Sequence, residues 1–198
     1  LLGGRTTQAS LVARGAEVFV AETSGSRISV YNRADGSLLR EWRMRLLSDD
    51  ADVLIADEED HRVRGVWTQG IAVDGDELYA ARPEESAISV HDTTTGARTR
   101  SFSVDFAGAH FGISLALIDG RLYLTRPQRD REEARAKGGV RVYARTGTLL
   151  ERDFCRGAIV QPDGLCEAGP FVAVASYQEK ALALFTRGGS GGGVLVRR

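Results

Sequence analysis

The chain has 198 residues, enough for one ordinary domain or one repeat array, with 42% hydrophobic and 27% charged residues. That balance excludes a disordered tail and a membrane protein, and no apolar run approaches the length of a membrane span. The net charge of −1 removes the long-range attraction on which nucleic-acid binding depends. Two cysteines, Cys155 and Cys166, are too few for a disulfide scaffold or a cysteine zinc site.

The sequence repeats itself. Residues 71–102 align without a gap on residues 11–42, at an offset of 60 positions, so that Ile88 meets Ile28 and Gly96 meets Gly36. Further copies keep the same order of strand, tight turn, strand, polar loop and strand; they span 46–67, 115–154 and 165–196. Coincidental apolar runs would not keep that order, so we expect five structural repeats.

In chain order, the first repeat predicts four strands, near 11–13, 18–21, 27–31 and 38–42. The second repeat shows no fourth strand, because only Thr68-Gln69-Gly70 separate Trp67 from Ile71. The third and fourth repeats again have fourth strands, near 98–102 and 149–153. For the last repeat the candidate fourth strand is Val194–Val196, which follows a Gly/Ser-rich segment, and the alternative is a disordered tail.

The strands within a repeat differ in pattern. Second strands are almost wholly apolar, which fits burial on both faces; they are Val18–Ala21, Leu78–Ala81, Leu122–Thr125 and Phe171–Ala175. Third strands such as Ile88-Ser89-Val90 and Val140-Arg141-Val142 alternate instead, which predicts one wetter face. Glycine-containing turns such as Asp119-Gly120-Arg121 separate the strands.

Repeated small antiparallel sheets predict an all-β fold, a β-propeller, in which neighbouring blades cover each other's faces. We expect residues 1–198 to form one propeller domain of about five four-stranded blades. The missing fourth strand of the second repeat leaves two readings open. One is a closed five-bladed ring, and the other is an incomplete array or part of a six-bladed ring.

Several segments carry a family signature: Asp52-Val-Leu-Ile-Ala-Asp57 with Asp60-His61-Arg62-Val63, Gly70-Ile-Ala-Val-Asp74, Glu77-Leu-Tyr-Ala-Ala81, and Arg27-Ile-Ser-Val-Tyr31 followed by Gly36. Together they resemble the NHL repeat, and the resemblance extends over residues 10–187. It implies a propeller, usually with six blades, that serves mostly as a binding platform. Some relatives in that family are lyases or lactone hydrolases.

Propeller strands are lettered a to d from the central channel outwards, and the b–c and d–a loops share the usual binding face. Long loops of this chain fall on that face. Directly after the b strands stand Glu22, Asp57, Arg82, Arg126 and Ser176. Either Asp57 and Arg82 form an ion pair between blades, or Arg82 and Arg126 converge on an anion, which guanidinium groups bind in a bidentate way.

The intact repeats and the lack of a recognisable catalytic set predict a non-enzymatic NHL-type propeller that binds a protein or peptide. The arginines make an acidic partner one option, and the net charge disfavours nucleic acid. We expect no cofactor and no bound metal. The alternative is a metal-dependent propeller enzyme, a lyase or a lactonase-like hydrolase. The candidate binding residues are Arg82, Arg126, Glu22, Asp57, His110 and Tyr177.

Overall fold

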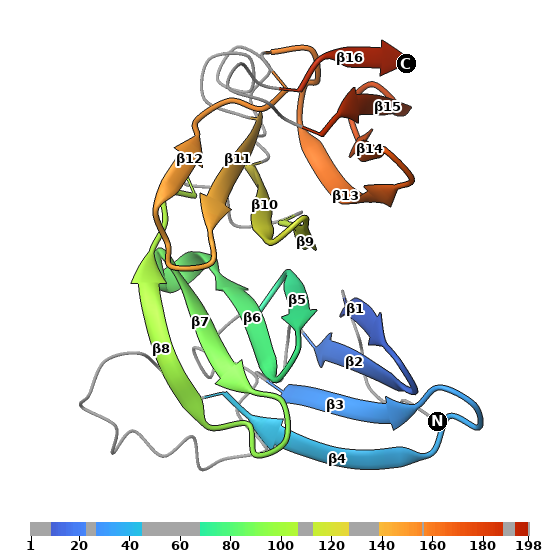
Figure 1. The fold of residues 1–198 in the computed structure, drawn as a ribbon, viewed down its shortest axis with the longest axis vertical. Coiled ribbons are helices and arrows are strands. Elements are labelled where there is room, and N and C mark those ends of the chain that lie inside the picture. The colour runs from blue at the N-terminus through green and yellow to red at the C-terminus, as the bar shows by residue number, and fades with distance from the viewer. Residues whose placement is uncertain are drawn as a thin grey trace.

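A computed structural model of the chain describes residues 9–22, 27–44, 68–106, 113–126, 139–155, 157–187 and 193–197. These residues form four antiparallel sheets of four strands each, which we call the first to fourth blades (Figure 1). The first blade contains β1 (Ala9–Arg14), β2 (Glu17–Glu22), β3 (Arg27–Asn32) and β4 (Leu38–Arg43). The second contains β5 (Ile71–Asp74), β6 (Glu77–Arg82), β7 (Ala87–Asp92) and β8 (Arg98–Ser103).

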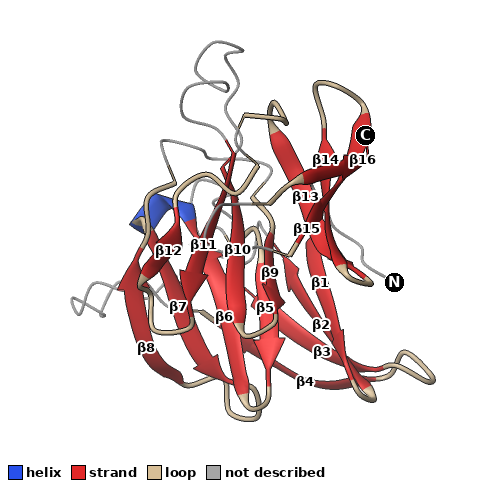
Figure 2. Ribbon diagram, turned by 45° about the horizontal axis from the view of Figure 1, so that its top comes forward, coloured by secondary structure: helices blue, strands red, loops and turns tan. Residues whose placement is uncertain are grey.

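The third blade contains β9 (Leu115–Ile118), β10 (Arg121–Arg126), β11 (Gly139–Ala144) and β12 (Leu149–Glu151). The fourth contains β13 (Pro162–Ala168), β14 (Phe171–Ser176), β15 (Ala181–Thr186) and β16 (Leu195–Arg197). The 3-10 turn η1 (Pro83–Glu85) is the helical element of the described residues (Figure 2). None of the helical structure in these ranges has the length and hydropathy that a bilayer crossing requires.

Each blade is a meander whose strands pair in chain order, and the innermost strands contact one another in series, β1 with β5, β5 with β9 and β9 with β13. Figure 1 shows the blades following one another along an arc around these inner strands. Tight turns make the meander possible: Asp119 and Gly120 both have positive φ, as a two-residue turn between twisted strands requires. The predicted all-β propeller of four-stranded blades is confirmed.

The hydrophobic core lies between the blades. Leu78 and Ala80 of β6 pack against the first blade, whereas the alternate residues Tyr79 and Ala81 pack against the third. We call the face that a blade turns to the preceding blade its backward face, and the other its forward face. Because successive residues of a strand point to opposite faces, one apolar b strand serves two interfaces at once.

The prediction of a wetter face on the third strands is wrong. Ser29, Ser89 and Arg141, the polar members of the alternation, are all buried. They lie on the backward faces of their blades, and a neighbouring blade covers that face in the second and third blades. The alternation of apolar and polar residues in the third strands therefore distinguishes the two faces of a blade, and it does not indicate that one face is exposed to water.

The expected five-blade count is not supported, because the described residues form four blades. The predicted repeat 46–67 lies outside the described residues. Phe19 and Ile28 of the first blade share one hydrophobic cluster with Leu78 and Ala80 of the second. The two blades that flank that repeat in the sequence are thus in direct contact through these residues. The last predicted repeat is the fourth blade, and its candidate strand at Val194–Val196 corresponds to β16.

An aromatic side chain from one blade covers a glycine of the next. Gly96, in the turn between β7 and β8, has φ +73°, and a Cβ added there would overlap the Trp42 ring of the first blade. Gly147 in the third blade faces Phe102 of the second in the same way. Glycine is therefore required twice over at this turn, once for its left-handed backbone and once for the close approach of the ring.

Gly96→Ala and Gly36→Ala form a matched pair, since Gly36 occupies the same turn of the first blade with φ +72° but has nothing within 4 Å of an added Cβ. Both substitutions force alanine into a left-handed backbone, at a cost of about 1–2 kcal/mol. Only Gly96→Ala also displaces Trp42, so we expect its free energy of unfolding in urea to fall by a further ~1–3 kcal/mol. Equal losses for the two variants would contradict the proposed packing.

Candidate functional site

The blades have two chemically different ends. The turn end carries the short a–b and c–d turns, for example around Gly75 and Gly96. The loop end carries the b–c and d–a connections, and a direct contact joins these two kinds of connection. Arg126, the last residue of β10, forms an ion pair with Asp105, which follows β8 in the preceding blade. The b–c and d–a loops therefore share one end of the molecule, as predicted.

Strand register confirms that four of the five predicted positions after the b strands are equivalent in the four blades. Glu22 pairs with Arg27, Arg82 with Ala87, Arg126 with Gly139 and Ser176 with Ala181, each at the first residue of strand c. All four residues are buried. The side of the strand that they share faces the preceding blade in the second to fourth blades, so Arg82, Arg126 and Ser176 are interface residues at the loop end, and Glu22 is their buried equivalent in the first blade.

Arg126 belongs to the best-defined charged cluster of the loop end, which we call the Asp105 clamp. Asp105 Oδ2 lies 3.2 Å from Arg126 Nη2 and 2.8 Å from Arg141 Nη1. Both arginine side chains are nearly buried, whereas 56% of the Asp105 side chain is exposed. Burial lowers the pKa of Arg126, and the positive charge of Arg141 lowers it further, against the raising effect of Asp105. Two cations therefore meet one anion here.

Arg82 occupies the same position one blade earlier but has different surroundings. Its side chain is fully buried and forms an ion pair with Glu85 in η1. Burial lowers the pKa of Arg82 to about 10, and Glu85 opposes that shift. Within the described ranges Nη1 and Nη2 of Arg82 have no hydrogen-bond partner. Arg82 faces the first blade and Arg126 the second, so the described contacts place the two guanidinium groups in different interfaces.

Some of the remaining candidates have hydrogen-bond partners, one is exposed to solvent, and others lie outside the described residues. Glu22 accepts a hydrogen bond of 2.6 Å from Arg27, and the Ser176 hydroxyl donates one of 2.6 Å to the Val160 carbonyl. Tyr177 follows β14 at the loop end and is 70% exposed. Asp57, its expected pairing with Arg82, and His110 lie outside the described residues. Their roles stay predictions.

The sequence interpretation missed Asp105 and Arg141. Asp105 lies in a d–a connection, where an isolated acidic residue gives no periodic signal. Arg141 does carry one: the equivalent residues of the first two blades are Ser29 and Ser89, so an arginine replaces a serine in the middle of a buried strand. A long cation at a position where the first two repeats have a serine indicates a charged partner inside the interface.

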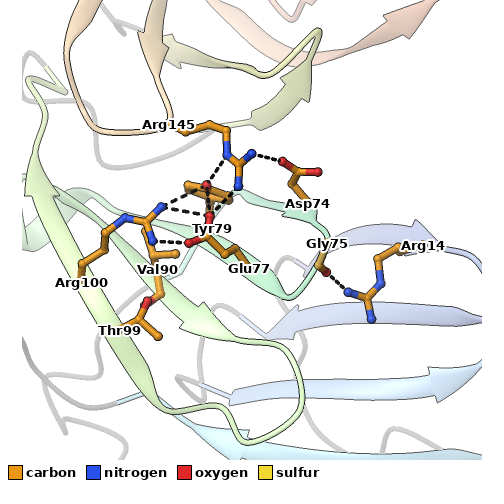
Figure 3. A network of polar contacts seen from close by, with 9 residues as sticks. All are labelled: Arg14, Asp74, Gly75, Glu77, Tyr79, Val90, Thr99, Arg100 and Arg145. Carbon is orange, nitrogen blue, oxygen red and sulfur yellow. Dashed lines mark hydrogen bonds and ion pairs between the residues drawn. The ribbon is translucent and has the colours of Figure 1, made fainter.

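The turn end carries a second polar network, shown in Figure 3. Arg145 of the third blade reaches into the second, where its Nη1 lies 2.7 Å from Asp74 Oδ2 and its Nη2 lies 2.8 Å from Glu77 Oε2. Arg145 Nε also donates a 2.9 Å hydrogen bond to the Tyr79 hydroxyl, and Arg100 forms an ion pair with Glu77. Each charge is matched by an opposite charge, so the network joins two blades and does not present an unsatisfied group to a ligand.

Similar arginines join the other interfaces at the turn end. Arg40 of the first blade donates a 3.0 Å hydrogen bond to the Thr93 carbonyl of the second. Arg187 of the fourth blade lies 2.8 Å from Asp119 of the third. The turn end is thus a row of structural contacts, and the candidate functional site is the loop end. Among the described residues no group of three or more His, Cys, Asp or Glu side chains is arranged to hold a metal ion.

Comparisons with known proteins agree on the fold. No family model and no curated protein matches the chain. The computationally designed Ika4 protein superposes with a TM-score of 0.56 at 15% identity, covering 95% of this chain and 96% of that one. A catalytically inactive virginiamycin B lyase from Staphylococcus aureus, solved with quinupristin, gives 0.61 at 15% identity and covers 99% and 56%.

BamB from Moraxella catarrhalis gives a TM-score of 0.52 at 16% identity, covering 96% of this chain and 49% of that one. The chain thus spans about half the length of these two natural proteins. At such low identity the similarity shows the β-propeller fold alone, and the NHL type of the repeats is not confirmed.

Glu77→Gln tests the turn-end network through pH. The hydrogen bond from Arg100 is the main cause that holds the pKa of Glu77 well below its ordinary value of 4.5, with further bonds from Tyr79 and Arg145. Ionised Glu77 therefore stabilises the fold above pH 4.5, and this contribution is lost as the pH falls through the lower folded-state pKa.

We expect Glu77→Gln to lower the urea-unfolding free energy at neutral pH, and the difference from the unmodified chain to shrink as the pH falls below 4.5. Asp76→Asn, at an exposed carboxylate in the same turn, is the matched control and should have little effect at any pH. A difference that does not depend on pH would contradict the role assigned to ionised Glu77.

Proposed function

We propose that this protein is a non-enzymatic binding scaffold of the NHL propeller type, and that its loop end binds an acidic segment of a protein or peptide. The observation that carries the proposal is the Asp105 clamp, in which Arg126 and Arg141 contact the same carboxylate oxygen. The clamp holds one carboxylate already, so its chemistry is that of carboxylate recognition. The resemblance of the repeats to NHL sequences supports the choice of family.

The charge balance of the clamp favours an additional or replacement anion. Two guanidinium groups are almost withdrawn from water, and in such surroundings charge-assisted hydrogen bonds are stronger than at a free surface. Within the described residues Nε of Arg126 and Nε of Arg141 have no hydrogen-bond partner. Asp105 is itself largely exposed, so an acidic side chain from a partner can approach and replace it.

Other residues at the same end extend this surface. Tyr177 offers an exposed aromatic ring, a side chain that is enriched in protein interfaces. Buried Arg82, with Nη1 and Nη2 that lack partners among the described residues, is a second candidate anion contact in the neighbouring interface. Glu22, Asp57 and His110 complete the set that we propose for the binding face.

The alternative is a metal-dependent propeller enzyme of the lyase or lactonase-like class. It is supported by the NHL resemblance, since some relatives in that family are lyases or lactone hydrolases. It is also supported by the similarity of fold to virginiamycin B lyase and to a putative 6-phosphogluconolactonase. Metal analysis of the purified protein separates the two proposals: a stoichiometric bound ion would favour the enzyme.

The test uses a fluorescein-labelled hexaglutamate peptide as the probe, with hexalysine as the charge-reversed control. We measure the affinity for hexaglutamate by fluorescence anisotropy. We expect the dissociation constant to rise by at least about tenfold in Arg126→Gln and in Arg141→Gln, since each change removes a charge-assisted hydrogen bond. Asp105→Asn should instead strengthen binding, because it removes the competing carboxylate. Arg33→Gln, at an exposed arginine of the turn end, is the matched control and should change nothing.

Urea unfolding of each variant separates lost binding from lost folding, and Arg126→Lys keeps the charge while it removes the guanidinium fork. Equal affinity of the folded Arg126→Gln and Arg141→Gln variants for hexaglutamate would overturn the proposed site. The same would follow from tighter binding of hexalysine than of hexaglutamate.

A further inference from the structure

The two ends of the arc expose residues that the inner blades bury. Leu11 on the backward face of the first blade is 68% exposed, whereas its equivalents Ile71 and Leu115 in the next two blades are 2% and 4% exposed. Val18 and Val20 beside it are also partly exposed, whereas their equivalents Leu78 and Ala80 are fully buried. Among the described residues no blade covers these apolar side chains of the first blade, although the polar residues Glu22 and Ser29 on the same face are buried.

The forward face of the fourth blade has the same character. Leu182 is 59% exposed, whereas the equivalent residues Ile28, Ile88 and Val140 are 0% exposed. Leu184, two residues further along β15, is partly exposed, and its equivalents Val30 and Val90 are fully buried. Figure 1 shows these two faces at opposite ends of the arc, on β1–β3 and on β14–β15.

These two surfaces are the two halves of one blade–blade interface. Between the first and second blades, Ile28 and Val30 on a forward face pack against Leu78 and Ala80 on a backward face. If the fourth blade packed on the first blade of another copy in the same way, its Leu182 and Leu184 would form the forward face of the contact. The backward face would be formed by Leu11, Val18 and Val20. The Gly36 turn fits this arrangement, because it has the left-handed backbone of Gly96 and Gly147 but, in the described structure, no atom where they receive an aromatic ring.

Repeat arrays normally end in polar faces, because an apolar end binds whatever matches it. We infer that this chain associates with a second copy of itself head to tail: the forward face of the fourth blade of one copy packs on the backward face of the first blade of the other. The partner is a second copy because both halves of the contact are present in one chain and repeat the interface that already joins its blades. Such a contact is heterologous, since it joins two different faces.

Sedimentation velocity of the intact chain over a range of concentrations tests the inference. We expect a mass that rises with concentration above that of one chain. Leu11→Arg and Leu182→Arg should each weaken the association by at least about tenfold, because each places a charge in an apolar contact. The matched control is Leu150→Arg, which changes a half-exposed leucine on β12 of an inner blade and should leave the association unchanged.

Mixing the variants distinguishes head-to-tail contact from general stickiness. Leu11→Arg keeps an intact fourth blade and Leu182→Arg keeps an intact first blade, so an equimolar mixture should form a heterodimer through one undamaged contact. A single-chain mass at all concentrations would overturn the inference. So would association that survives Leu182→Arg, or a mixture that stays monomeric. None of these outcomes depends on hexaglutamate binding, so this inference and the proposed function fail separately.

Discussion

The structure depends on one constraint: a four-stranded sheet with apolar residues on both faces must be covered on both faces. The strands β6 and β10 have buried residues at nearly every position, and no single sheet can shield both sides of such a strand. Stacking of successive blades around the inner strands provides that shielding. The core of the described part of the chain is accordingly three separate clusters, each largely shared by neighbouring blades, and not one central mass.

The same constraint explains why the charged groups of the loop end are buried. A residue at the end of strand b on a backward face points at the preceding blade, whatever its polarity. Apolar side chains there would only add to the core, but Arg82 and Arg126 bring charges into the interface, and each has a carboxylate beside it. The difference between the two lies in the source of the carboxylate: Glu85 comes from the same blade as Arg82, whereas Asp105 comes from the blade before Arg126. The Asp105 clamp therefore joins two blades, whereas the Arg82–Glu85 pair lies within one.

Much of the fold was predictable because the repeats align through their apolar positions. Ile28 and Ile88, or Gly36 and Gly96, can be matched by eye, and each match identified a strand or a turn correctly. The five-blade count could not be settled in this way, because the segment 46–67 aligns with the other repeats, while Thr68-Gln69-Gly70 leaves little chain for its fourth strand. The sequence pattern shows which residues are apolar, but it does not show which sheets pack against each other.

The candidate site was predictable only in part. The equivalence of Glu22, Arg82, Arg126 and Ser176 could be read from the repeats, but their burial could not, since a loop-end position suggests solvent until the neighbouring blade is in place. For the same reason the sequence pattern predicted that Arg141 lies on a solvent-facing side of its strand, because the blade that covers it could not be foreseen. Asp105 is paired across an interface with residues of another blade, and a single sequence carries no sign of such a pairing.

The contact between Trp42 and Gly96 has a consequence for how such a protein can evolve. The second blade receives the Trp42 ring of the first at Gly96 and places its own Phe102 against Gly147 of the third, so a duplicated copy of this repeat matches either neighbour at this contact. Tandem duplication or recombination at this boundary can lengthen or shorten the array without any compensating mutation. A repeat that loses its glycine, by contrast, packs less closely on the ring of the preceding copy, and this loss is smallest for a repeat at the beginning of a series.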